Sequence, residues 1–191
     1  MIFTFSEISN TLKTFSDCSL GKNSEIKNNP LIKNFDAPLA IIKDFEKHCP
    51  LEHGRWEGER GNSKWIPDDD YIPQKSNPEN KTWKELKKEY NIDGIVFKNG
   101  EPQFGEISKG DVKIEPFSTD RSDNFDKADI EMAKQHDCSP EDVAKWRKEN
   151  KYTWHECRDM ETMQKVPSVV HNNVTHSGGI SEAKKEVTNN E

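Results

Sequence analysis

Half of the chain's six histidines lie close together near its C-terminus, at positions 155, 171 and 176, and Glu156 follows the first of them. Neutral imidazole binds zinc, nickel and similar divalent ions, and its pKa suits activation of water near neutral pH. An ion that contacts a phosphate oxygen, beside an imidazole that accepts a proton from water, can hydrolyse a phosphodiester. The spacing therefore suggests a metal-dependent hydrolase, while three solvated and inert histidines are the plain alternative.

The residues around His155 predict the frame that positions this cluster. The run YTWHEC, residues 152–157, and the run TMQKVP, residues 162–167, are rich in β-forming residues and are separated by the polar stretch RDME. This pattern predicts a β-hairpin, in which Gln164 falls nearly opposite His155. A hairpin packed against the element that follows it can bring the three imidazoles to one point.

A short helix is expected after the hairpin, from Ser168 to about His176, and the chain is expected to fray after the glycines that follow. Adjacent residues of a strand point to opposite faces, so His155 and Glu156 are not expected to serve equally.

Local start and turn signals predict the other elements. Thr82 with Glu85 forms a capping box, and Ser139 before Pro140 marks a second helix start. The Gly54–Pro73 segment, rich in tryptophan, glycine and proline, is expected to be ordered but irregular. Helices are expected over 6–15, 38–48, 83–90, 121–136 and about 140–150, and strands over 94–104, around an Asn99-Gly100 turn, and 111–117. The fold class that this order indicates is α+β.

Composition limits what the whole chain can do. The 191 residues are 31% hydrophobic and 33% charged, which predicts that part of the chain does not pack. We expect a lead or linker over residues 1–53, one domain over 54–182 and a flexible tail over 183–191. No apolar run is long enough to span a membrane, and the first residues lack the features of a secretory signal. The four cysteines form no CxxC pair.

The net charge of −7 argues against a protein that binds nucleic acid over its whole surface. A bound divalent cation supplies positive charge locally, so a basic cleft confined to the surroundings of His155 is the expectation. Four basic residues just before the hairpin, Lys145, Arg147, Lys148 and Lys151, are candidates for phosphate contacts, with a plain solvated helix face as the alternative.

The segment TWHECRDMETMQKVPSVVHNNVTHSGG, residues 153–179, resembles the C-terminal motif of the WHH-type nucleases of the HNH/endonuclease VII superfamily. These are toxin modules of bacterial polymorphic toxin systems, built on a treble-clef or ββα-metal core. The resemblance extends back through IDGIVFKNGEPQF and WRKENKYTWHE and covers residues 54 to 182. One position departs from the family name: Glu156 stands where a second histidine is implied, although related toxin nucleases carry the same His-Glu pairing.

The resemblance implies a ββα-metal, HNH-like nuclease core with added helices and an upstream hairpin. It also implies a metal-dependent DNA endonuclease, the toxic tip of a larger secreted carrier protein, which is blocked by an immunity protein and acts in the target-cell cytoplasm. The cofactor would be one divalent ion, Mg, Mn, Ni or Zn. His155, His171 and His176 would be the metal ligands, or His155 would instead be the base that deprotonates water. His155, Glu156, Gln164 and His171 would be the catalytic set, with Gln164 at the position of the central Asn of HNH motifs.

Two alternatives remain open at the level of sequence. The first is an RNase of the same fold, because a ββα-metal site attacks a phosphate that DNA and RNA share. The second is a non-catalytic binding module, in which the three histidines hold a structural zinc ion. A fourth protein ligand such as Cys157 would favour the structural ion, whereas three ligands and an open position would favour catalysis.

Overall fold

The structure is a computed structural model, and it describes residues 46–189. The helix predicted over 6–15 lies outside the described residues, and the one predicted over 38–48 lies almost entirely outside them. Two small antiparallel sheets and five α-helices make up the described part, which confirms the α+β class. None of its helices is long and apolar enough to cross a membrane.

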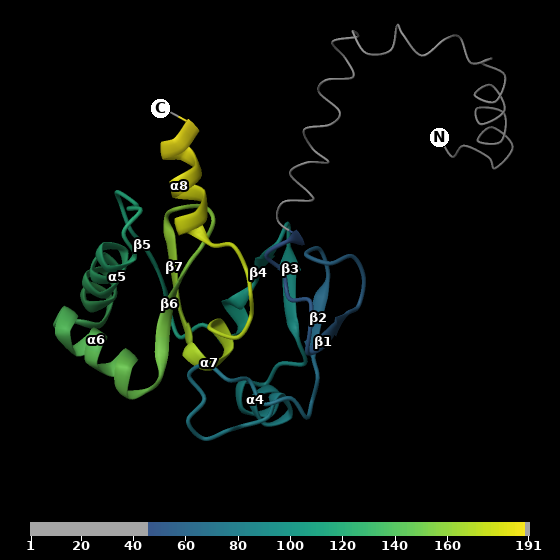
Figure 1. Cartoon of the computed structure of the whole chain (residues 1–191). Coiled ribbons are helices and arrows are strands. Elements are labelled where there is room, and N and C mark those ends of the chain that lie inside the picture. Colours follow the sequence, from purple (N-terminus) through teal and green to yellow (C-terminus); the bar gives the residue numbers. More distant parts are fainter. Residues whose placement is uncertain (1–45, 190–191) are drawn as a thin grey trace, which may run out of the picture. The chain divides into compact units, whose positions relative to one another are not determined.

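The first sheet has the strand order β1-β2-β3-β4 (Figure 1). Its strands are β1 (Gly54–Trp56), β2 (Lys64–Pro67), β3 (Ile95–Lys98) and β4 (Glu101–Pro102). The predicted strand, Asn99-Gly100 turn and return strand correspond to β3 and β4. The prediction of an irregular segment from Gly54 onward is wrong, because β1 and β2 pair there in antiparallel register.

The second sheet contains the predicted hairpin. Strands β6 (Tyr152–Glu156) and β7 (Thr162–Pro167) pair in antiparallel register, and His155 is the partner of Gln164. Strand β5 (Asp111–Lys113) pairs with the other edge of β7 and is shorter than predicted, so the strand order is β5-β7-β6.

The helices begin where the sequence signals place them. Helix α4 (Trp83–Tyr90) has the predicted capping box, and α6 (Pro140–Glu149) begins after Ser139, whose side chain accepts from the backbone of the third helical residue. Helix α5 (Arg121–His136) begins after Asp120, whose side chain accepts from the backbone N–H of Ser122, the second helical residue. A short 3-10 helix, η2 (Phe104–Ile107), leads from β4 towards β5.

The chain after the hairpin differs from the prediction. Helix α7 (Ser168–His171) is a single turn, so His176 lies in the connection that follows it. The chain then forms helix α8 (Gly179–Asn189), where a frayed tail was expected from the polar composition. Only its beginning contacts the rest of the described chain, because Ala183 is 8% exposed and Glu182 pairs with Arg158, whereas residues 184–188 are exposed.

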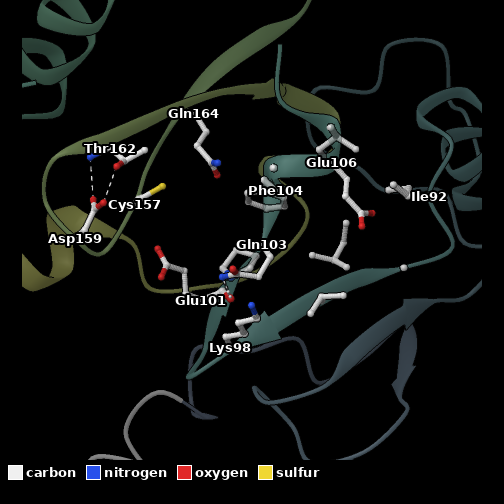
Figure 2. A pocket seen from close by; sticks show the side chains of 16 residues that line it. Ile92, Lys98, Glu101, Gln103, Phe104, Glu106, Cys157, Asp159, Thr162 and Gln164 are labelled. Atoms are coloured by element: carbon white, nitrogen blue, oxygen red, sulfur yellow. Dashed lines mark hydrogen bonds between the residues drawn. The ribbon is translucent and has the colours of Figure 1, made fainter. Parts of the chain in front are cut away.

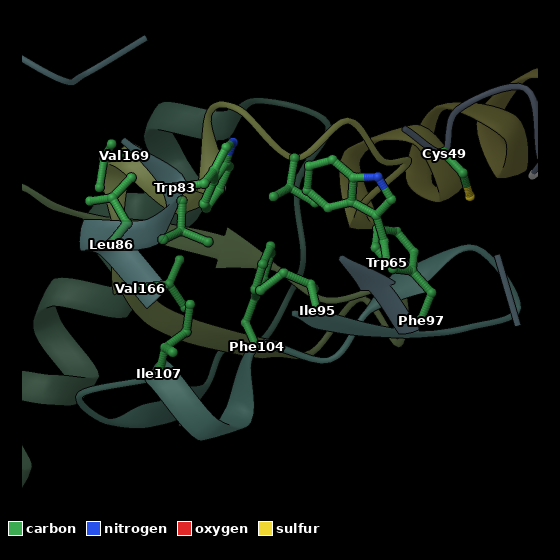
Figure 3. Close-up of a cluster of buried hydrophobic side chains, with 12 residues drawn as sticks. Cys49, Trp65, Trp83, Leu86, Ile95, Phe97, Phe104, Ile107, Val166 and Val169 are labelled. Atoms are coloured by element: carbon green, nitrogen blue, oxygen red, sulfur yellow. The ribbon is translucent and has the colours of Figure 1, made fainter. Parts of the chain in front are cut away.

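The second sheet separates two hydrophobic clusters. One cluster packs residues of the first sheet and α4 with Phe104, Val166 and α7, as Figure 3 shows. The other packs α5 and α6 against Trp154 and Met163 of the hairpin. Cys49 is 2% exposed within the first cluster, so the packed part of the chain begins before residue 54.

Candidate metal centre

The three C-terminal histidines converge at the end of the hairpin. His155 lies on β6 and is 1% exposed, His171 ends α7, and His176 lies in the loop before α8. Their ring centroids are 4.9 to 5.3 Å apart, and one ring nitrogen from each lies within 4.8 Å of the other two. Residues separated by up to 21 positions are thus brought within the reach of a single ion.

The ring of Phe104 contacts the rings of all three histidines. Its ring meets His155 edge to face at a centroid distance of 5.0 Å, and it lies 5.9 Å from His171 and 5.7 Å from His176. Phe104 is itself 1% exposed and belongs to the hydrophobic cluster of Figure 3. The apolar wall limits the rotation of the imidazoles and keeps water from one side of them.

Hydrogen bonds on the outer nitrogens orient two of the rings. The Nδ1 atom of His171 lies 3.1 Å from the Asn172 side-chain oxygen, and Nδ1 of His176 lies 2.7 Å from the Val174 carbonyl oxygen. Both partners are acceptors, so each Nδ1 carries the hydrogen and each Nε2 keeps a lone pair. Outer-shell bonds of this kind are typical of metal-binding histidines.

The third ring contains a polar atom that lacks a partner. His155 Nδ1 lies 3.3 Å from His171 Nε2, whereas His155 Nε2 is buried and has no hydrogen-bond partner among the described residues. An unpaired buried polar group costs about 1–3 kcal/mol. A cluster with an unpaired imidazole nitrogen and inward lone pairs fits a bound divalent ion of the borderline class, such as zinc or nickel.

Electrostatics keep the cluster neutral. Burial lowers the pKa of His155 well below its usual value, and the neighbouring His176, His171 and Arg121 act in the same direction. Burial lowers the pKa of His171 to about 4, and it also lowers the pKa of His176. The three imidazoles are therefore unprotonated at neutral pH, which is the form that binds metals.

A buried carboxylate lies beside the cluster. Glu156 is 4% exposed, and its carboxylate accepts from Arg121 Nε at 2.9 Å and from Asn124 Nδ2 at 3.0 Å. Arg121 and Asn124 come from the first turn of α5, while the Arg121 side chain stays 61% exposed. The helix start thus fixes one carboxylate and presents one guanidinium to solvent.

The three histidines and the Glu156–Arg121 pair line one cavity of about 720 Å³. His155 and Glu156 point to opposite faces of β6, as expected, but both line this cavity because the strand ends there. The lining also contains three cationic side chains, Lys47, Lys75 and Arg121, against the carboxylates of Glu52 and Glu156. The surroundings of the histidines are therefore not uniformly negative, although the net charge of the chain is −7.

Gly178 closes the cavity next to the histidines. A side-chain carbon placed there would lie 2.9 Å from the Glu156 carbonyl oxygen and 4.0 Å from both His155 Cε1 and His176 Cδ2. The loop that carries His176 therefore depends on a close backbone approach that only glycine allows.

Gln164 does not join the cluster in the structure. It is the register partner of His155, but its amide donates to the Asp111 carboxylate at 3.0 Å. Its side chain lines a different cavity, shown in Figure 2, together with Glu101 and Cys157. A role for Gln164 in orienting His155 remains a prediction.

The four basic residues before the hairpin do not gather around the histidines. Arg147 is 8% exposed and is paired with the buried carboxylate of Asp129, so its charge is committed inside the protein. Lys151 pairs with Glu79, and Lys145 lies 3.9 Å from Glu149. None of the four lines the cavity of the metal centre, and we no longer assign Arg147 to the substrate surface.

The residues that the sequence did not single out as functional are Arg121 and Asn124. Their position depends on the N-cap Asp120 and on the packing of α5 against the second sheet, which no local spacing reveals. The family resemblance spans residues 54 to 182 and so covers both positions, but it gives neither residue a role.

The three imidazoles at the end of the β-hairpin, followed by a helical turn, form a group that could hold one divalent ion. In a comparison with known families, residues 94–178 match the family model for the DNase/tRNase domain of colicin-like bacteriocin. The matched segment contains the three histidines, Glu156 and Arg121, and it supports a nuclease toxin domain in this part of the chain. A search of curated proteins found no significant match.

Proposed function

We propose that this chain is a metal-dependent endonuclease that hydrolyses phosphodiester bonds of DNA. The observation that carries the proposal is the convergence of three neutral imidazoles beside an oriented carboxylate, within a cavity lined by cationic groups. The match to the colicin nuclease model supports it from sequence. The finer assignment to the WHH-type, HNH-like ββα-metal nucleases is part of the same proposal.

In this mechanism His155, His171 and His176 would hold one divalent ion, which would supply a Lewis acid for a phosphate oxygen. Glu156 accepts the proton of the attacking water, because its carboxylate is fixed at the edge of the cavity by two donors. Arg121, with its exposed guanidinium, binds a phosphate oxygen of the substrate.

Three protein ligands are typical of catalytic rather than structural zinc sites. Cys157 does not belong to the three-histidine group, and no fourth ligand joins that group among the described residues. These observations favour catalysis over the structural-zinc module.

The biological setting belongs to the proposal as well. We infer a toxin that is secreted through a larger carrier protein, acts in the cytoplasm of a target cell and is blocked in the producer by an immunity protein. The description of the matched family as a bacteriocin domain supports this setting. Because the same description includes tRNases, an RNase acting on tRNA is the second candidate.

The test is cleavage of supercoiled plasmid by the purified chain, with EDTA or with Mg²⁺, Mn²⁺, Ni²⁺ or Zn²⁺. His155→Ala and Glu156→Gln are compared with His136→Ala, a control on α5 that lies outside the cavity of the metal centre. We expect nicking that requires metal, survives in the control and disappears in His155→Ala, with unchanged circular dichroism. Metal-dependent cleavage of tRNA but not plasmid would establish the second candidate, and retained cleavage by His155→Ala would refute the site.

A further inference from the structure

A second group of metal-binding side chains shares His155 with the cluster. Glu101 on β4, His155 on β6 and Cys157 just after β6 each place one donor atom within 4.8 Å of the other two. Glu101 and Cys157 line a cavity of about 470 Å³, separate from the one that the three histidines share with Arg121. Figure 2 shows both side chains directed towards this cavity.

His155 provides a sign of a ligand that both groups share. Its ring is 1% exposed, Nδ1 lies beside His171, and Nε2 is the buried nitrogen without a hydrogen-bond partner in the described part of the chain. Because His171 Nε2 keeps its lone pair, His155 Nδ1 carries a hydrogen, and the lone pair of His155 lies on Nε2, where an ion of either group can bind it.

Backbone and side-chain bonds hold the other two donors in place. The Arg158 backbone N–H donates to Glu101 Oε1 at 2.7 Å, which orients the carboxylate and leaves its second oxygen for an ion. The Arg158 guanidinium is anchored to the Asn99 carbonyl oxygen and to Glu182. The Cys157 backbone N–H donates to the Thr162 carbonyl oxygen at 3.0 Å, so the thiol is carried on an ordered hairpin turn.

We propose that Glu101, His155 and Cys157 form a second metal site, selective for zinc, that competes with the three-histidine centre for His155. Thiolate is a soft ligand that selects zinc over magnesium and manganese, and one carboxylate and one imidazole complete a set common in zinc sites. Zn–S and Zn–N bonds of about 2.3 and 2.1 Å place tetrahedral donors about 3.3–3.7 Å apart. The observed separation needs only a small inward movement of the side chains.

Competition follows from the chemistry of imidazole. A neutral ring has one lone pair, so His155 serves one ion at a time. Zinc at the second site removes a ligand from the three-histidine centre and inhibits the nuclease; this consequence rests on the proposed function. The two centres open to different cavities, so an ion reaches the second site without passing the substrate.

The site itself is tested by titration with Co²⁺, which gives a near-ultraviolet charge-transfer band only with a thiolate ligand. Cys18 and Cys138 are first replaced by serine, because Cys138 is exposed, whereas Cys49 stays because it is buried in the core. We expect the sulfur band in this background, a stronger band after His171→Ala and none after Cys157→Ser. A band that is absent from both the background and His171→Ala, or that persists in Cys157→Ser, would overturn the site.

The competition is tested by adding Zn²⁺ to plasmid cleavage supported by Mg²⁺ or Mn²⁺. Each variant is normalised to its own rate without zinc. We expect half-inhibition to require at least about tenfold more zinc for Cys157→Ser than for the parent. Equal inhibition would refute the competition. If no cleavage occurs with any ion, the proposed function fails, while the cobalt titration still decides whether the second site exists.

Discussion

The buried pair between Arg147 and Asp129 gives a quantitative test of the packing, and we predict a large loss of stability in Arg147→Met. Asp129 is 3% exposed and accepts three hydrogen bonds, from Arg147 Nε at 2.7 Å, Arg147 Nη2 and Trp154 Nε1 at 2.9 Å. Removing Arg147 takes away two of the three donors and leaves a buried carboxylate without its counter-ion. Breaking a buried ion pair in this way costs about 3–5 kcal/mol.

A double substitution separates the cost of the orphaned charge from the value of the pair. In Asp129→Leu/Arg147→Met no charge is buried, so most of the loss is expected to be recovered. Recovery stays incomplete, because the Trp154 indole N–H then lacks its acceptor, at a cost of about 1–3 kcal/mol. The free energy of unfolding of each variant is measured by urea titration followed by tryptophan fluorescence.

The matched control is Lys148→Met, on the same helix, for which a change within about 0.5 kcal/mol is expected at an exposed position. A loss below about 1 kcal/mol in Arg147→Met would refute the structural role of the pair. So would a folded Arg147→Met protein that keeps its stability but binds nucleic acid more weakly, since that result would return Arg147 to the substrate surface.

Two further predictions concern the metal centre. Because burial lowers the pKa of all three histidines, that of His171 to about 4, the fall in metal affinity with decreasing pH, measured by calorimetry, should be centred below pH 6.5. In the metal-free protein, the neutral buried histidines should make their full contribution to the free energy of unfolding above about pH 6.5, the pKa of histidine in the unfolded chain. That contribution should be lost as the pH falls towards 4. A loss of metal affinity centred on pH 6.5 would contradict both expectations. Gly178→Ala places a carbon 2.9 Å from the Glu156 carbonyl oxygen and should weaken metal binding about 10–100-fold, whereas Gly105→Ala, which meets nothing within 4 Å, should not. Equal affinities in the two variants would contradict the packing at Gly178.

Local signals in the sequence predicted the elements whose causes are local. The hairpin register that pairs His155 with Gln164 follows from two β-rich runs of matching length around a polar turn. The starts of α4 and α6 follow from Thr82 and Ser139, whose side chains cap the next turn. In each case the residues that fix the geometry are within a few positions of one another.

Elements held by distant contacts were missed or misassigned. Strands β1 and β2 lie in a segment of glycine, proline and tryptophan with no alternating pattern, and their pairing depends on burial of Trp65 beneath the sheet. Helix α8 is polar along most of its length, so its sequence predicts a frayed tail. Arg147 has the composition of a surface residue, and only the packing of α6 on α5 shows that its charge is buried.

The relation between His155 and Glu156 shows where pattern-based reasoning stops. Alternation along a strand separates their side chains correctly, and it suggests that only one of them can belong to the site. The structure places Glu156 towards Arg121 and Asn124 at the start of α5, while His155 faces His171 and Phe104. Because β6 ends at Glu156, side chains from both faces of this strand line one cavity. His155 as a metal ligand and Glu156 as a base can therefore act on the same substrate. The division of roles thus depends on where the strand stops relative to α5, a distance that no spacing in the sequence encodes.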